Sequence, residues 1–113
     1  MNKAERALVI GARIKSDASL WSLEESLDEL ELLARTAGLE VVGRVAQTLD
    51  TVNPATYIGR GKVSEIREIL TFESAEIALF DVELSPTQQR NLEEALDARV
   101  VDRTALILDI FAR

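Results

Sequence analysis

A glycine turn followed by basic residues is the stretch of this sequence best suited to binding an anion. The turn consists of Gly59, Arg60, Gly61 and Lys62. Apolar residues then recur at helical spacing, at Val63, Ile66, Ile69 and Leu70. The turn therefore precedes a helix, whose first N–H groups attract anions, and glycines there allow a tight bend. We interpret it as a phosphate-binding turn for a nucleotide or a nucleic-acid backbone, the alternative being an ordinary loop with solvated basic residues.

Residues around the turn would extend such a site. Tyr57 would stack on a base or, alternatively, pack in the core beside Ile58. Three arginines are weaker candidates for phosphate contacts: Arg44, Arg67 and Arg90. The turn is not the phosphate loop of an NTP-hydrolysing enzyme, because Val63 stands where that loop requires Ser or Thr.

Two carboxylates follow predicted strands. Asp81 and Asp102 each stand at the end of a short apolar run, and ligands of parallel sheets bind beyond the carboxyl ends of the strands. They are weak candidate ligands for Mg²⁺, the alternative being helix caps and loop ion pairs. The chain contains no cysteine and no histidine, which excludes Ser-His-Asp and Cys-His catalysis and argues strongly against zinc.

The length and composition of the chain predict one acidic domain that spans residues 1–113. The chain is 47% hydrophobic with a formal net charge of −7, which disfavours non-specific nucleic-acid binding but permits a local basic face. Five acidic residues crowd into one predicted helix, whereas Arg44, Arg60, Lys62 and Arg67 are expected to gather near the turn. No apolar run is long enough to span a bilayer and no signal-peptide pattern is present, so we expect a cytoplasmic protein.

The hydrophobic pattern predicts an α/β layered domain with a mainly parallel sheet of about four strands flanked by helices. The predicted strands cover residues 5–14, 39–49, 77–80 and 99–102. The predicted helices run from a capping box of Ser22 and Glu25 to Gly38, over 62–72, from a capping box of Ser85 and Gln88 through Leu96, and over 104–113. The last helix has no stop signal, which is typical of a cut in a longer protein.

Three long motifs carry a family resemblance. They are Pro54-Ala-Thr-Tyr-Ile-Gly-Arg-Gly-Lys-Val, Asp81-Val-Glu-Leu-Ser-Pro-Thr-Gln-Gln-Arg-Asn-Leu-Glu and Val101-Asp-Arg-Thr-Ala-Leu-Ile-Leu-Asp-Ile-Phe-Ala-Arg. In order and over nearly the whole chain, they resemble the N-terminal domain of HflX-type GTPases. In that family a helical arm and a GTPase domain follow, so the chain is expected to be either a fragment of such a protein or a stand-alone homologue.

The resemblance implies a domain that docks on the large ribosomal subunit and its rRNA, in a family that splits ribosomes under stress. GTP, magnesium and catalysis would belong to the GTPase domain, so this chain is expected to be non-enzymatic. The alternative is a nucleotide-binding domain that holds ATP or GTP at the turn, with magnesium placed by Asp81 or Asp102. A structural role is also compatible, in which Leu106, Ile110 and Phe111 pack on the arm or GTPase domain or, exposed, drive dimerisation.

Overall fold

The computed structural model describes residues 4–16 and 20–112, apart from the side chains of Leu20 and Trp21. Strands and helices alternate along this part of the chain, which confirms the predicted α/β fold. The elements are β1 (Arg6–Ile14), α1 (Leu20–Thr36), β2 (Glu40–Leu49), α2 (Arg60–Phe72), β3 (Ile77–Phe80), α3 (Pro86–Leu96), β4 (Arg99–Asp102) and α4 (Arg103–Phe111).

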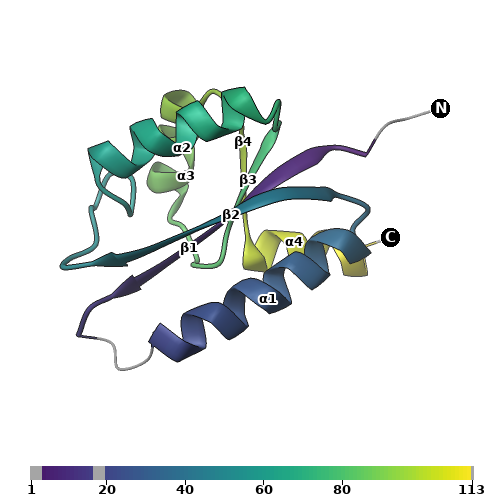
Figure 1. The fold of residues 1–113 in the computed structure, drawn as a ribbon, viewed down its shortest axis with the longest axis horizontal. Helices are drawn as coiled ribbons and strands as arrows, with labels where there is room; N and C mark the ends of the chain where they lie inside the picture. Colours follow the sequence, from purple (N-terminus) through teal and green to yellow (C-terminus); the bar gives the residue numbers. More distant parts are fainter. Residues whose placement is uncertain (1–3, 17–19, 113) are drawn as a thin grey trace.

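The four strands form one parallel sheet in the order β2-β1-β3-β4. The chain first passes from β1 to its neighbour β2, and then returns across β1 to reach β3. Helices α1 and α4 therefore cover one face of the sheet, and α2 and α3 cover the other (Figure 1). The direction of winding changes between β1 and β3, and the carboxyl ends of these two strands form the topological switch point of the sheet.

Both central strands are buried on both faces. Leu8 and Ile10 of β1 join the core under α2 and α3, whereas Ala7 and Val9 join the core under α1. Such strands read in the sequence as continuous apolar runs. Gly11 lets α1 lie close to β1, because a Cβ added at this position would stand 2.7 Å from Leu23 Cδ1.

Several predicted boundaries are confirmed. β3 and β4 have the predicted bounds, and Ser85 and Gln88 form the predicted capping box with Pro86 in the first turn of α3. The capping box predicted for Ser22 and Glu25 is wrong, since α1 already begins at Leu20. A serine three residues before a glutamate also occurs inside helices, so the pattern alone does not locate the first turn.

The last helix differs from the expectation in the side that it exposes. Leu106 is 3% exposed and packs in the core with Ile77 and Leu79, so the expectation that it is exposed is wrong. The reason is that α4 turns back from β4 and lies against the sheet. The outward apolar residues are Leu108 and Phe111, 64% and 83% exposed. Arg113, predicted as the end of this helix, lies outside the described residues. No described helix combines the length and apolarity needed to cross a membrane.

Candidate phosphate-binding site at the start of α2

The first turn of α2 has no side-chain cap. Gly59 is its N-cap residue, in an extended conformation with φ −73° and ψ 163°, and within the described part of the chain no side-chain hydrogen bond caps the helix. The first intrahelical bond runs from Val63 N–H to Gly59 O, at 3.0 Å. The N–H groups of residues 60–62 therefore have no acceptor within the helix and lie at the positive end of its dipole.

The other two helix starts with described caps are satisfied internally. The hydroxyl of Ser85 accepts from Gln88 N–H at the start of α3, and Asp102 accepts from Ala105 N–H at the start of α4. The start of α2 thus differs from both in having N–H groups that an external anion would satisfy.

The glycines of the turn do not serve an unusual backbone shape. Gly59 has an ordinary negative φ, and an added Cβ at Gly59 or at Gly61 would meet nothing within 4 Å. The expectation that the glycines allow a tight bend is therefore wrong, since neither has the positive φ that favours glycine. What the missing side chains provide is an unobstructed approach to the backbone N–H groups of the first turn.

The loop before the turn is fastened to α3. Asn53 and Tyr57 form an isolated antiparallel bridge, with Tyr57 in the left-handed region at φ 65°. Gln88 Nε2 donates to Asn53 O over 3.3 Å, and Asn91 Nδ2 donates to Ala55 O over 3.0 Å. Tyr57 is half-buried and packs against the core, which supports the packing role among the two that its position left open.

A hollow of about 460 Å³ lies beside this helix start, lined by residues 47–54 and by Gly59. Gln47 borders it, and its Oε1 is buried with no hydrogen-bond partner in the described part of the chain. Nothing in the sequence marked Gln47, because an isolated glutamine in a strand has no motif. A donor on a bound molecule would satisfy this oxygen.

Two of the predicted basic residues share one surface near the turn. Arg60 and Arg67 are exposed, lie two helical turns apart and border a hollow between α2 and α3 together with Thr56 and Ala95. Arg67 Nη1 donates to Ala95 O over 3.2 Å. Lys62 is paired with Glu65, with Nζ 2.6 Å from Oε2, so its charge is partly compensated. Arg90 is exposed on α3 but does not line this hollow.

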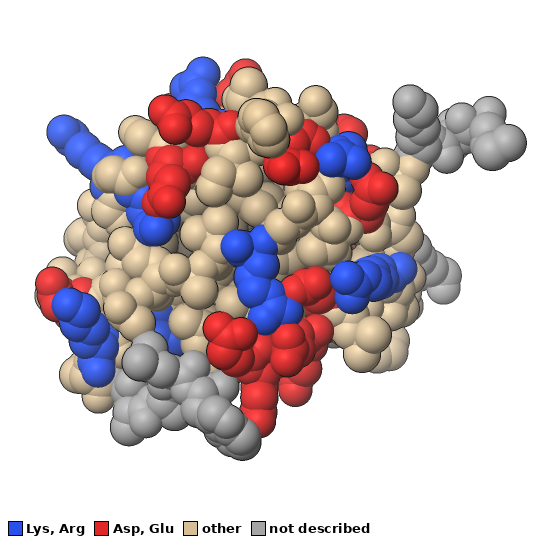
Figure 2. All heavy atoms as spheres, viewed as in Figure 1, with Lys and Arg blue, Asp and Glu red and all other residues tan. Residues whose placement is uncertain are grey.

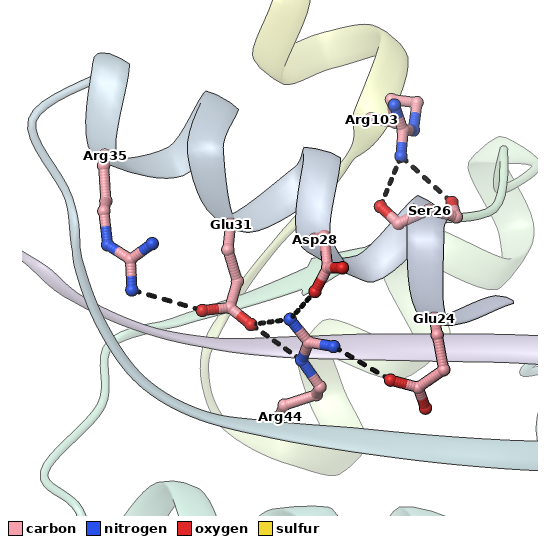
Figure 3. A network of polar contacts seen from close by, with 7 residues as sticks. All are labelled: Glu24, Ser26, Asp28, Glu31, Arg35, Arg44 and Arg103. Carbon is pink, nitrogen blue, oxygen red and sulfur yellow. Dashed lines mark hydrogen bonds and ion pairs between the residues drawn. The ribbon is translucent and has the colours of Figure 1, made fainter.

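Arg44 lies elsewhere, on the face of the sheet that α1 covers. Its guanidinium contacts Glu24 at 3.2 Å, Asp28 at 2.7 Å and also Glu31 (Figure 3). The hydrogen bond from Arg44 to Asp28 is the largest of the effects that raise the pKa of Arg44 above its usual value, and contacts with Glu31 add to it. The expectation that Arg44 gathers at the turn is wrong, because strand side chains alternate and this one points away from α2.

The two candidate metal ligands are engaged in structural contacts. Asp81 Oδ1 accepts from Ala12 N–H, and its Oδ2 accepts from Arg13 Nη1 and Ser26 Oγ, at 3.1, 2.6 and 3.3 Å. The oxygens of Asp102 accept from Leu84 N–H at 3.1 Å and Ala105 N–H at 2.9 Å. The described residues contain no group of three His, Cys, Asp or Glu that could hold a metal ion. Both carboxylates therefore act as structural acceptors.

A second arginine joins the network at the switch point. Arg103, the first residue of α4, donates to the backbone oxygen of Ser26 over 2.7 Å and to its hydroxyl over 3.0 Å. The Ser26 hydroxyl in turn donates to Asp81. The start of α4 is thereby connected through α1 to the ends of β1 and β3.

Comparison with known proteins places the chain in a family. Residues 24–112 match the family described as GTP-binding GTPase N-terminal. The GTPase HflX of Flavobacterium psychrophilum is 42% identical over 109 residues, which are 96% of this chain and 26% of that protein. The GTPase HflX of Escherichia coli K12 is 38% identical over 109 residues, which are 96% of this chain and 25% of that protein.

A solved structure has the same fold. A GTP-binding protein from the archaeon Sulfolobus solfataricus, in complex with GDP, superposes with a TM-score of 0.67 at 21% identity, over 96% of this chain and 30% of that chain. The chain spans about a quarter of the length of the curated relatives described above. The chain belongs to the GTP-binding GTPase N-terminal family and corresponds to the N-terminal portion of the HflX GTPases.

Proposed function

We propose that this domain docks an HflX-type GTPase on the large ribosomal subunit by binding rRNA phosphates at the start of α2. The main support for this proposal is the uncapped first turn of α2. Arg60 lies beside this turn, and Arg67, two helical turns further along α2, lines the same hollow as Arg60. A phosphate placed there would accept from the N–H groups of residues 60–62 and pair with Arg60. The family and the names of the relatives support a role within a GTPase of this kind.

The domain has no enzymatic role in this proposal. GTP, magnesium and ribosome splitting under stress belong to the complete protein, in which the domain would act by positioning the GTPase. Contacts with backbone phosphates give affinity without base specificity, and they weaken as salt rises. With about two or three phosphates engaged, binding by the domain alone is expected to be weak at physiological salt.

The test is binding of purified large ribosomal subunits to the domain across a salt series. Arg60→Ala/Arg67→Ala should weaken binding and make the dependence on salt shallower by about two units of logarithmic slope. The matched control is Arg35→Ala, which removes an exposed arginine from α1 on the opposite face. Equal loss in both variants would show a general charge effect and contradict the proposed site.

A second candidate function is binding of free ATP or GTP at the same helix start. The hollow of about 460 Å³ beside Gly59, with the unpartnered Oε1 of Gln47, favours it. Calorimetric titration with each nucleotide, with and without magnesium, separates the two candidates. Saturable nucleotide binding without subunit binding would replace the first proposal by the second.

A further inference from the structure

The outer edge of β2 is open in the described part of the chain. β2 is ten residues long, and among the described strands it pairs with β1 alone. Lys15 N–H donates to Leu49 O over 2.7 Å, so Leu49 directs its backbone groups toward β1. Because this direction alternates along a strand, Val45 and Gln47 also bond toward β1. The N–H and C=O groups of the intervening residues, Arg44, Ala46 and Thr48, point outward.

This edge lacks the features that usually prevent strand addition. From residue 43 to residue 49, β2 contains no proline and no lysine, the residues that most often protect an exposed edge. The register shift of β2 lies before Gly43, at the other end of the strand. The charge of Arg44 is drawn back toward α1 by its carboxylate partners. The opposite edge of the sheet, β4, is only four residues long.

Acidic side chains stand above this edge on one face. Glu24, Asp28 and Glu31 lie along the side of α1 that overhangs β2 and surround Arg44 (Figure 3). The side chains of Glu24 and Asp28 are 67% and 70% exposed. Figure 2 shows mainly uncharged atoms across the middle of the molecule, where β2 runs in Figure 1, and a dense acidic group below it over α1.

A side-chain hollow opens at the same place. It has a volume of about 370 Å³ and is lined by Leu23, Glu24, Ala46, Gln47 and Thr48. Leu23 and Ala46 supply apolar wall, and Glu24 supplies a carboxylate. This combination suits a lysine or arginine, whose apolar stem packs on hydrocarbon while the cationic head reaches an acid.

We propose that β2 accepts an extended basic segment of a partner protein as a fifth strand of the sheet. Backbone groups of residues 44, 46 and 48 would pair with the segment, and its lysine or arginine side chains on the α1 side would meet Glu24 and Asp28. A second copy of this chain is disfavoured as the occupant, because a two-fold pairing of β2 with itself brings two acidic α1 helices together. Gln47 and Thr48 border both this hollow and the one beside the start of α2. The test is nevertheless independent of the phosphate site, because it reads the amides of β2 and the carboxylates of α1.

Three designed peptides test the proposal, each alternating threonine or valine with lysine, glutamine or glutamate. Hydrogen exchange of the ¹⁵N-labelled domain is followed by NMR at low salt. The lysine peptide should slow exchange of the amides of Arg44, Ala46 and Thr48, with affinity in the order lysine, glutamine, glutamate. Glu24→Gln/Asp28→Asn should weaken binding of the lysine peptide about three- to tenfold. The control Glu68→Gln/Glu94→Gln, on α2 and α3, should not change it.

Ala46→Pro tests the backbone part of the proposal. Proline removes an outward N–H group that β1 does not use, so the sheet keeps its ladder while strand addition is blocked. Ala46→Ser, which keeps the N–H group, should bind as the parent does. Absence of slowed exchange at residues 44, 46 and 48 with every peptide, or equal affinity for all three peptides, would overturn the proposal. Protection of these amides by self-association without peptide would assign the edge to a second copy and overturn it as well.

Discussion

Arg13 and Asp81 form an ion pair that joins the ends of β1 and β3 at the topological switch point. Nη1 of Arg13 lies 2.6 Å from Oδ2 of Asp81, whose side chain is fully buried. The same carboxylate accepts from Ala12 N–H. The position where sheets of this kind often bind ligands is therefore occupied by the protein's own charges.

Removal of this carboxylate should be costly. Asp81→Ala leaves the N–H group of Ala12 without its acceptor and removes the carboxylate that neutralises the Arg13 guanidinium, which keeps its bond to Ala12 O. We expect a loss of about 3 kcal/mol in the free energy of unfolding. Urea denaturation followed by circular dichroism measures it. Arg13→Met/Asp81→Leu should recover part of the loss, because it removes both charges together. A loss below about 1 kcal/mol in Asp81→Ala would show that the pair does not fasten the two strands.

Gly61→Ala should separate stability from binding. Alanine is favoured over glycine in a helix and its Cβ meets nothing within 4 Å, so the free energy of unfolding should rise by about 0.5–1 kcal/mol. The methyl group would stand beside the N–H groups of the first turn, so binding to large ribosomal subunits should fall. Thermal melting and the subunit-binding assay measure the two effects. Increased stability with unchanged subunit binding would contradict a backbone phosphate contact at this turn.

Ser85→Ala should cost about 1 kcal/mol, the usual value of an N-cap serine. The change removes the acceptor of Gln88 N–H. It keeps the bond from the backbone N–H of residue 85 to Gln88 Oε1 and the bond from Gln88 Nε2 to Asn53 O, which holds the loop. Subunit binding should stay close to that of the parent domain, because the bonds that hold the loop remain. Ser64→Ala, at an exposed position inside α2, is the matched control for stability and should change it little.

The two sides of α4 should respond differently to truncation. Leu106→Ala should cost about 2–4 kcal/mol, because Leu106 is in the core under α1 and α4. Leu108→Ser/Phe111→Ser should leave stability nearly unchanged, since both side chains are largely exposed. If the domain dimerises, sedimentation velocity should show that this double variant remains monomeric. A dimer that persists would place the contact elsewhere.

The elements of the fold could be predicted because their signals are local. Ile77–Phe80 is a continuous apolar run because β3 is buried on both faces, and Ser85 is recognisable from Pro86 and Gln88 beside it. The residues of the turn at Gly59 were identified in the same way, from the glycines and the helical pattern after them.

The contacts between distant segments could not be predicted. Arg13 and Asp81 are 68 positions apart, and their pairing depends on β3 lying next to β1, which no local pattern encodes. The prediction that Arg44 lies near the turn was wrong for a related reason. The positive charge of Arg44 suggested a place beside the basic turn. The face of the sheet on which a strand side chain projects depends on the register of the strand, and a shift of one residue moves the side chain to the opposite face.

The position of Gly11 has a consequence for the acidic residues that overhang β2. A side chain at Gly11 would meet Leu23 and Leu27 of α1 and would lift the helix away from the sheet. The lack of a side chain at Gly11 therefore determines the height of Glu24 above β2. Residue 11 thus controls how long a basic side chain on an added strand must be to contact Glu24. It does so although it lies in the neighbouring strand, in the interior of the domain.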